Sequence, residues 1–402
     1  MTPTPLSPTT RWTVFTAAWA TTAIAAGFAF LGPFLSLILE RETGSGGFIG
    51  LFATVGALTT VALTPFGPWL MRRASAPRLV AVGVVGGTLC FALYPLAPGV
   101  AWWFPIRFLQ GLFLTVVFIV GETWINSVAP EAKRGRILSV YAIFLAGGLG
   151  AGAALSALVI ESVGLEGWVP YLVGAAIVAT GLAPLSARAH AAMEPPSEEH
   201  GSPRAMGRIL VRSPGLMASV FVFGAIEFSL FHMVPVYGVR LGFGEADAAM
   251  LLLALPLGSV LLTYPIGMAA DRFDRRRVLG TLFALCAAVG AVLGVLDSYW
   301  AIMAALALFV GAAGGLYTVG LAILSERNRG GAIAAANSAF IFAYGLGSLA
   351  SPAVIGAGMD AAGPGAMPLI LAGACAVGGL VFAALERRQQ QHRLDSPRAQ
   401  TM

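Results

Sequence analysis

Charged residues are scarce in this chain of 402 residues: Asp, Glu, Lys and Arg make up 11% of it, against 57% hydrophobic residues. An average soluble domain carries about 25% charged residues. The mean hydropathy is +0.82. These values exclude a water-soluble globular fold.

Motifs for catalysis, metal binding and nucleotide binding are also missing. The three cysteines lie in apolar runs without CxxC spacing, and only one of the four histidines, His232, lies in an apolar run. Neither HExxH nor the phosphate-binding pattern GxxxxGK[ST] occurs. We therefore expect no enzyme, no ATP-driven pump, no metal and no cofactor.

Long apolar runs are what the sequence has in place of charge. Each can cross a hydrocarbon core about 30 Å thick, and the first is too long for a cleavable signal peptide. We predict an all-α polytopic membrane protein with twelve transmembrane helices in two pseudo-symmetric six-helix bundles. The predicted helices are 12–39, 47–70, 79–97, 102–128, 137–160, 168–185, 215–239, 246–270, 278–296, 300–324, 332–356 and 366–385.

One long polar segment divides the runs into two sets of six. It contains Pro195 and Pro196 among several glutamates, and it has too few apolar residues to pack. The predicted domains are an N-terminal bundle (1–185), a cytoplasmic linker (186–214), a C-terminal bundle (215–385) and a cytoplasmic tail (386–402). Pro33 and Pro235, and likewise Gly148 and Gly345, recur at an offset of about 200 residues, which indicates duplicated halves.

Basic residues follow the loops of one side. With both termini in the cytoplasm, 21 of the 24 Lys and Arg residues fall on the cytoplasmic side, and Arg41, Arg107 and Arg240 are the exceptions. We therefore predict a multi-pass inner-membrane protein. The basic residues lie in short loops between apolar spans, so we expect a lipid bilayer and no nucleic acid as the partner.

A glycine, an acid and a basic cluster follow the eighth apolar run. The residues are Gly267, Asp271, Arg272, Arg275 and Arg276. Here the sequence resembles the major facilitator superfamily, whose signature in this loop is GxxxDRxxRR. The resemblance covers the whole chain.

Other residues extend the resemblance. Arg107, Gln110 and Gly111 match the family's RxxQG pattern, and Arg134 and Arg136 follow in the loop after the fourth run. The first-half copy of the loop departs from the pattern at Met71, where the family usually has aspartate.

The loop at Asp271 fits a latch, because a carboxylate can lie against the positive amino-terminal end of a helix. By the repeat, that helix is the fifth, which begins just after Arg136. The alternative is that Arg275 to Arg277 only enforce topology. With Met71 in place of the acid, the matching latch in the other half is expected to be weak or absent.

Ionisable residues inside membrane spans are costly, so each is a functional hypothesis. Glu227 lies about 18 Å into the seventh helix, near the bilayer midplane, which favours a proton or cation site. Arg107 and Glu122 share the fourth helix but lie about 22 Å apart in depth, so they cannot pair. His232 points about 140° away from Glu227 and reads as an interhelical histidine.

The family's central cavity is lined by helices 1, 4, 7 and 10, so the resemblance places Arg107, Glu122 and Glu227 around one space. We predict proton or substrate binding by those three together with Gln110, Asn126, Tyr317 and His232. Structural alternatives stay open: snorkelling for Arg107, a structural carboxyl for Glu227, and packing for Tyr317 and for Phe28 of the first helix.

The resemblance implies a secondary active transporter that moves a small organic solute by alternating access and uses a proton gradient as its energy source. A single buried acid per half favours efflux of a cationic or neutral compound. The alternatives are an uptake permease for a sugar or metabolite and a non-transporting sensor. Gly147, Gly148, Gly150 and Gly152 resemble the glycine-rich segment of proton-coupled drug antiporters but lack its Gly-Pro pair, and they could serve close packing instead. We expect a monomer.

Overall fold

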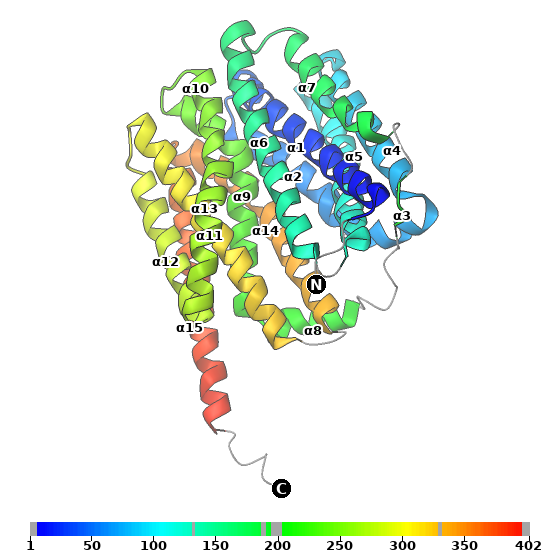
Figure 1. Ribbon diagram of the computed structural model, residues 1–402. Coiled ribbons are helices and arrows are strands. Elements are labelled where there is room, and N and C mark those ends of the chain that lie inside the picture. Colours follow the sequence, from blue (N-terminus) through cyan, green and yellow to red (C-terminus); the bar gives the residue numbers. More distant parts are fainter. Residues whose placement is uncertain (1–5, 131–132, 186–189, 194–202, 329–331, 396–402) are drawn as a thin grey trace. The chain divides into compact units, whose positions relative to one another are not determined.

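The computed structural model describes residues 6–130, 133–185, 190–193, 203–328 and 332–395, and every regular element in these ranges is a helix (Figure 1). The proline and glutamate stretch of the predicted linker, at 194–199, lies outside the described residues, as do the last seven residues of the tail.

Among the described residues, 11 helices are long and apolar enough to cross a membrane, and a shorter apolar helix covers Val169–Leu185. Together they correspond to the twelve predicted spans and confirm the all-α polytopic fold. The elements are α1 (Pro8–Thr43), α2 (Gly46–Leu63), η1 (Thr64–Phe66), α3 (Gly67–Arg73), α4 (Ala76–Leu93), η2 (Tyr94–Leu96), η3 (Val100–Trp102), α5 (Trp103–Val128), α6 (Arg134–Val163), α7 (Val169–Ala179), η5 (Thr180–Leu185), α8 (Pro203–Arg212), α9 (Pro214–Arg240), α10 (Glu245–Met250), η7 (Leu251–Leu253), α11 (Ala254–Arg272), α12 (Arg275–Leu293), α13 (Tyr299–Arg327), α14 (Ala332–Ala362) and α15 (Ala366–Asp395).

Contacts divide the chain into two compact units. Unit 1 holds the described residues of Met1–Glu198 together with Leu230–Pro256, and unit 2 holds those of Glu199–Ser229 and Leu257–Met402. Helix α9 therefore contributes its first part to unit 2 and its second part to unit 1. The domain boundaries expected from the sequence, at 185 and 215, stay a prediction.

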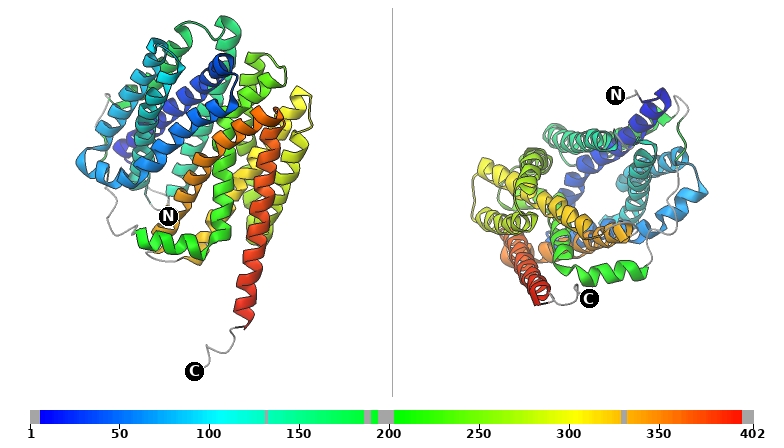
Figure 2. Two further views of the ribbon diagram at one scale, coloured as in Figure 1. Left: turned by 180° about the vertical axis from the view of Figure 1, so that it is seen from behind. Right: turned by 60° about the horizontal axis from the view of Figure 1, so that its bottom comes forward.

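Unit 1 is built around α1, which contacts α5, α6 and α7 (Figures 1 and 2). Glycines allow α6 to approach closely: a Cβ atom added at Gly152 would lie 2.2 Å from the Ala26 carbonyl oxygen, and one at Gly148 would lie 2.6 Å from Thr22. Small residues of this kind let membrane helices pack backbone to backbone. The geometry at these two positions favours the packing role over a transport signature.

Unit 2 also uses glycines to pack helices closely. A Cβ atom added at Gly347 of α14 would lie 2.0 Å from the Phe221 carbonyl oxygen of α9, and one at Gly224 would lie 2.3 Å from the Tyr344 oxygen. Elsewhere in the unit, α12 lies beside α13 and α15 (Figures 1 and 2). The closest helix pairs of both units thus depend on the absence of a side chain.

Helix ends are set by local chemistry. The Ser7 side chain accepts a hydrogen bond from the Thr10 amide, and Gly44 closes α1 in the left-handed conformation at φ 60°. Asp274 caps α12 by accepting from the amides of Arg276 and Arg277, each at 3.0 Å. A charged cap at a helix start also meets the positive end of the helix dipole.

The segment expected not to pack is partly ordered. Helix α8 forms within it and contacts α14. Further upstream, the Ala191 amide donates to Thr13 Oγ1 at 2.9 Å, and Trp124 Nε1 donates to the Ala191 oxygen at 3.0 Å. Beside them burial lowers the pKa of His190. Composition alone missed these contacts because they depend on single backbone groups.

Gly152→Ala should lower the melting temperature of the detergent-purified protein, because its methyl group meets backbone at 2.2 Å. Overpacking of this kind costs about 1–3 kcal/mol. Gly147→Ala is the matched control on the same helix, since nothing lies within 4 Å of its added Cβ. It should leave the melting temperature unchanged or raise it, because Ala favours helix by about 1 kcal/mol over Gly. Equal melting temperatures for the two variants would contradict the packing described for α1 and α6.

Candidate functional site

Arg107 is the central charged residue of unit 1. It lies near the start of α5 with 4% of its surface exposed. Its Nη1 donates to Gln110 Oε1 at 3.0 Å, and its Nη2 lies 2.7 Å from His232 Nε2. The guanidinium carbon lies over the rings of Phe28 at 5.2 Å and Phe52 at 5.4 Å. In the described part of the chain no carboxylate pairs with Arg107, so aromatic faces and neutral acceptors hold its charge.

The sequence prepares this arrangement on one helix face. A spacing of three residues brings Arg107 and Gln110 together. Gln110 Oε1 also accepts from the Tyr94 hydroxyl at 2.9 Å, so one amide oxygen joins two donors. A Cβ atom added at Gly56 would lie 3.0 Å from two guanidinium nitrogens, so this position of α2 leaves the room that the guanidinium occupies.

His232 must be neutral in this contact. A guanidinium has only donors, so His232 Nε2 has to accept with its lone pair, and the ring proton belongs on Nδ1. The ring is 3% exposed, and it meets Phe28 edge to face at 5.7 Å. His232 thus connects the second part of α9 with α5 and α1, all in unit 1.

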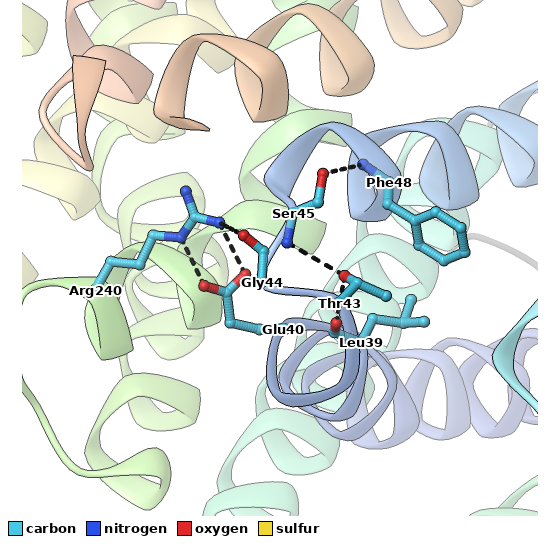
Figure 3. A network of polar contacts seen from close by, with 7 residues as sticks. All are labelled: Leu39, Glu40, Thr43, Gly44, Ser45, Phe48 and Arg240. Atoms are coloured by element: carbon cyan, nitrogen blue, oxygen red, sulfur yellow. Dashed lines mark hydrogen bonds and ion pairs between the residues drawn. The ribbon is translucent and has the colours of Figure 1, made fainter. Parts of the chain in front are cut away.

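A second set of contacts holds the same part of the chain at the end of α1 (Figure 3). Arg240 donates to both carboxylate oxygens of Glu40, at 2.7 and 2.9 Å, and to the Gly44 oxygen at 3.3 Å. Nearby, Arg41 donates to Glu245 at 2.7 Å. Arg41 and Arg240 are two of the three basic residues that the positive-inside rule leaves unexplained. The acids Glu40 and Glu245, which lie near the helix ends, were the sequence signal that could have paired them.

Glu227 is the acid within a membrane span of unit 2, and it is partly exposed. It occupies the middle of α9 and accepts a hydrogen bond from the Tyr344 hydroxyl of α14 at 2.8 Å. It forms no ion pair with any described residue. Tyr344 was missed from the sequence because nothing in the local pattern of α14 distinguishes it from a packing residue.

Aromatic rings form a row that ends at Tyr344, the hydrogen-bond partner of Glu227. Phe223 lies 5.9 Å from the Tyr344 ring and 5.4 Å from the Tyr317 ring, and Tyr317 lies 5.2 Å from Phe340. The structure therefore brings Tyr317 into a packed aromatic row that ends at the partner of Glu227. A role for Tyr317 in ligand binding stays a prediction.

The polar residues of α5, the fourth predicted span, fall into two groups. Glu122 is exposed, and Asn126 donates back to the Glu122 carbonyl oxygen at 3.0 Å within the helix. Thr115 instead lies 3.0 Å from Thr60, and a Cβ atom at Gly111 would meet Thr59. The part of α5 at Gly111 and Thr115 thus packs against α2, whereas Glu122 is exposed and Asn126 is partly exposed.

The signature loop lies at the end of unit 2 that holds α8. Arg275 pairs with Asp271 at 3.5 Å and with Glu326 of α13 at 2.5 Å. Arg276 and Arg327 both pair with Glu386 of α15, at 3.1 and 2.5 Å. These pairs line or border a cavity of about 820 Å³.

Other predicted residues of the loop region make fewer contacts. Arg272 is exposed, and no atom lies within 4 Å of a Cβ added at Gly267. Arg134 and Arg136 are exposed at the start of α6, while Met71 is buried. The latch from Asp271 onto α6 stays a prediction, because Asp271 and α6 belong to different units.

A helical membrane bundle that buries single charged groups in its spans belongs to the class of polytopic transporters and channels. The family model for the Major Facilitator Superfamily matches residues 17–257 and 245–401. The chain belongs to this superfamily: it is a multi-pass membrane transporter and not an enzyme.

Relatives and solved structures agree with the family. The uncharacterized MFS-type transporter YfkF of Bacillus subtilis (strain 168) is 25% identical over 329 residues, which cover 80% of this chain and 82% of that protein. A crystal structure of a mutant nucleoside transporter NupG has a TM-score of 0.77 at 13% identity, covering 93% of this chain and 99% of that chain. The POT family transporter PepTSo has a TM-score of 0.75 at 13% identity, covering 96% and 99%. These two structures show the fold alone.

His232→Gln should make the protein less sensitive to acid. Gln can still accept from Arg107 and does not titrate, whereas a protonated His232 cannot accept and places a second positive charge 2.7 Å from the guanidinium. At acid pH the melting temperature of the variant should therefore exceed that of the wild type by more than it does at neutral pH. His190→Gln is the matched control, because it removes a histidine that does not contact Arg107. An identical acid response in wild type and His232→Gln would contradict the neutral contact.

Proposed function

We propose that this transporter moves a small organic solute, cationic or neutral, out of the cell by alternating access, and that it is driven by proton uptake at Glu227. The observation that carries the proposal is the setting of this carboxyl group. It lies at the centre of a membrane span, it is only partly exposed, and its one hydrogen bond to a described residue comes from a neutral hydroxyl.

An ionised carboxylate without a cation beside it has a high free energy at that depth. Binding a proton or a cationic solute neutralises the charge, and contact with water solvates the carboxylate and so favours release of the proton or solute. A site that alternates between these two conditions couples the proton to the solute. The Tyr344 hydroxyl supports this role because it can donate to the carboxylate and accept from the protonated acid.

Arg107 is proposed to serve the solute path through its charge. It has no carboxylate among its contacts, and its Nε has no hydrogen-bond partner among the described residues. An acid brought near during the cycle, or an anionic group on a solute without net charge, would complete its shell. Gln110 and His232 hold the guanidinium in place meanwhile.

The placement in the cell follows from charge. The positive-inside rule supports an inner-membrane protein with both termini in the cytoplasm, since 21 of 24 basic residues then face that side. In this orientation the Arg240 and Glu40 contact lies at the outer end of unit 1, and the signature loop lies at the inner end of unit 2. We also propose a monomer with duplicated halves, 1–185 and 215–385, joined by the linker at 186–214.

Glu227→Gln should abolish proton-driven flux. A thermal-shift screen of the purified protein against metabolites and organic cations first identifies a stabilising solute, because a ligand of the folded state raises its melting temperature. In proteoliposomes, gradient-driven movement of that solute should then fall at least about tenfold in the variant, while solute exchange without a gradient continues.

Tyr344→Phe is the matched control, since it removes the hydrogen bond and keeps the carboxyl group. It should retain coupling with a changed pH dependence. Unchanged gradient-driven flux in Glu227→Gln would remove the coupling role. A solute accumulated in the direction of the cytoplasm would replace efflux by uptake.

A further inference from the structure

Unit 1 contains a cavity that takes no part in the proposed path. Its volume is about 530 Å³, within the range of about 300–1,000 Å³ that is usual for ligand pockets. Its walls come from the end of α1, the turn between α4 and α5, the turn between α6 and α7, and the start of α7. All four belong to unit 1.

Three aromatic rings line the inner part of this cavity. Tyr94, Trp103 and Tyr171 line it with exposures of 1%, 5% and 5%. The Tyr94 ring meets Trp103 edge to face at 5.4 Å and stacks on Tyr171 at 6.4 Å. The Tyr94 hydroxyl is engaged with Gln110, which fixes this ring. Fixed aromatic faces attract cations through their quadrupoles.

The charges at the mouth have an excess of acid. Arg41, Glu42 and Glu166 line the cavity. Arg41 pairs with Glu245 at 2.7 Å, so its positive charge is matched from outside the cavity. Among the described residues, neither Glu42 nor Glu166 forms an ion pair or a hydrogen bond through its side chain. Two carboxylates therefore remain to attract a positive ligand.

The turn between α6 and α7 is shaped to hold one of these acids. Gly164 and Gly167 take φ angles of 73° and 84°, which only glycine adopts without strain. Between them Leu165 is 3% exposed and anchors the turn, while Glu166 is exposed. Trp168 follows at the rim with 50% exposure. The turn thus presents a carboxylate and an indole beside the buried rings.

We propose that this cavity is a second ligand site, which binds an organic cation with flat apolar substituents, such as a quaternary ammonium, a phosphonium or a protonated aromatic amine. The rings take the apolar body and face the charge, and Glu42 and Glu166 neutralise it. An anion meets two carboxylates there and is rejected. The inference goes beyond the proposed function, because it needs neither Glu227 nor proton coupling.

The site is connected to the centre of unit 1 by hydrogen bonds. Tyr94 forms part of the aromatic lining and donates to Gln110, which in turn accepts from Arg107. Arg107 then contacts His232. A cation seated against Tyr94 is therefore two hydrogen bonds from the guanidinium, which gives the site a route for sensing the state of the second part of α9.

Tetraphenylphosphonium and tetraphenylborate test the site directly, because the two ions share a shape and differ in charge. Equilibrium binding is measured on the detergent-purified full chain, in wild type and in Glu227→Gln. We expect saturable binding of the phosphonium in both proteins. The double variant Glu42→Gln with Glu166→Gln should weaken it about tenfold or more, since both charges at the mouth are lost.

Glu161→Gln is the matched control, because Glu161 is an exposed acid near the same end of α6 that does not line the cavity. It should leave binding unchanged, and phosphonium binding that remains in Glu227→Gln belongs to this cavity and not to the proposed transport path. All of these substitutions replace Glu by the nearly isosteric Gln, so the variants should fold. Their melting temperatures verify this. Loss of flux in Glu227→Gln, with saturable phosphonium binding that still depends on Glu42 and Glu166, would separate this site from the proposed transport path.

The natural ligand could be a free cation or the amine headgroup of a lipid. Binding in nanodiscs of phosphatidylglycerol, which has no amine, is compared with binding in phosphatidylethanolamine. Weaker phosphonium binding in the second assigns the site to a headgroup, and equal binding assigns it to a free cation. Absence of saturable binding, equal affinity for tetraphenylborate, or full binding by the double variant would each overturn the proposal.

Discussion

A guanidinium keeps its charge at any accessible pH, so burying Arg107 constrains everything around it. The charge cannot be removed by loss of a proton, and no carboxylate of a described residue pairs with it. Two acceptors, on Gln110 and His232, and two aromatic faces, on Phe28 and Phe52, stabilise it. Gly56 has no side chain and so leaves space for the guanidinium. These groups come from α1, α2, α5 and α9. One residue therefore fixes the rotation of several helices about their axes.

The charged contacts at the helix ends differ in strength for the same physical reason. The Arg240 and Glu40 side chains are 14% and 16% exposed and meet through two parallel hydrogen bonds. The Arg41 and Glu245 side chains are 50% and 25% exposed. Exposed pairs contribute about 0–1 kcal/mol, whereas bidentate pairs withdrawn from water are stronger and more specific in geometry. The first pair holds the second part of α9 in place, and the second pair mainly balances charge.

The fold was predictable because a lipid environment leaves little choice: every backbone group has to be satisfied within a helix. Run lengths and turn residues located all twelve spans, and the buried charges Arg107 and Glu227 stood out through their cost. Their partners did not. These helices are apolar on all sides, so periodicity gives no direction for packing, and Tyr94, Phe52 and Tyr344 look like any core aromatic. Gly56 shows the same limit. Its lack of a side chain leaves room for the Arg107 guanidinium, and only the folded chain brings the two residues together.

Helix α9 has one part in each unit, and Pro235 lies just past the change at residues 229 and 230. A proline has no amide hydrogen, so the carbonyl oxygen of Phe231, four residues earlier, receives no backbone bond from it. The helix therefore lacks one backbone hydrogen bond at this point, which lowers its resistance to bending. A low bending stiffness at Pro235 would let each part of α9 move with its own unit during a transport cycle, while the helix stays continuous across the bilayer.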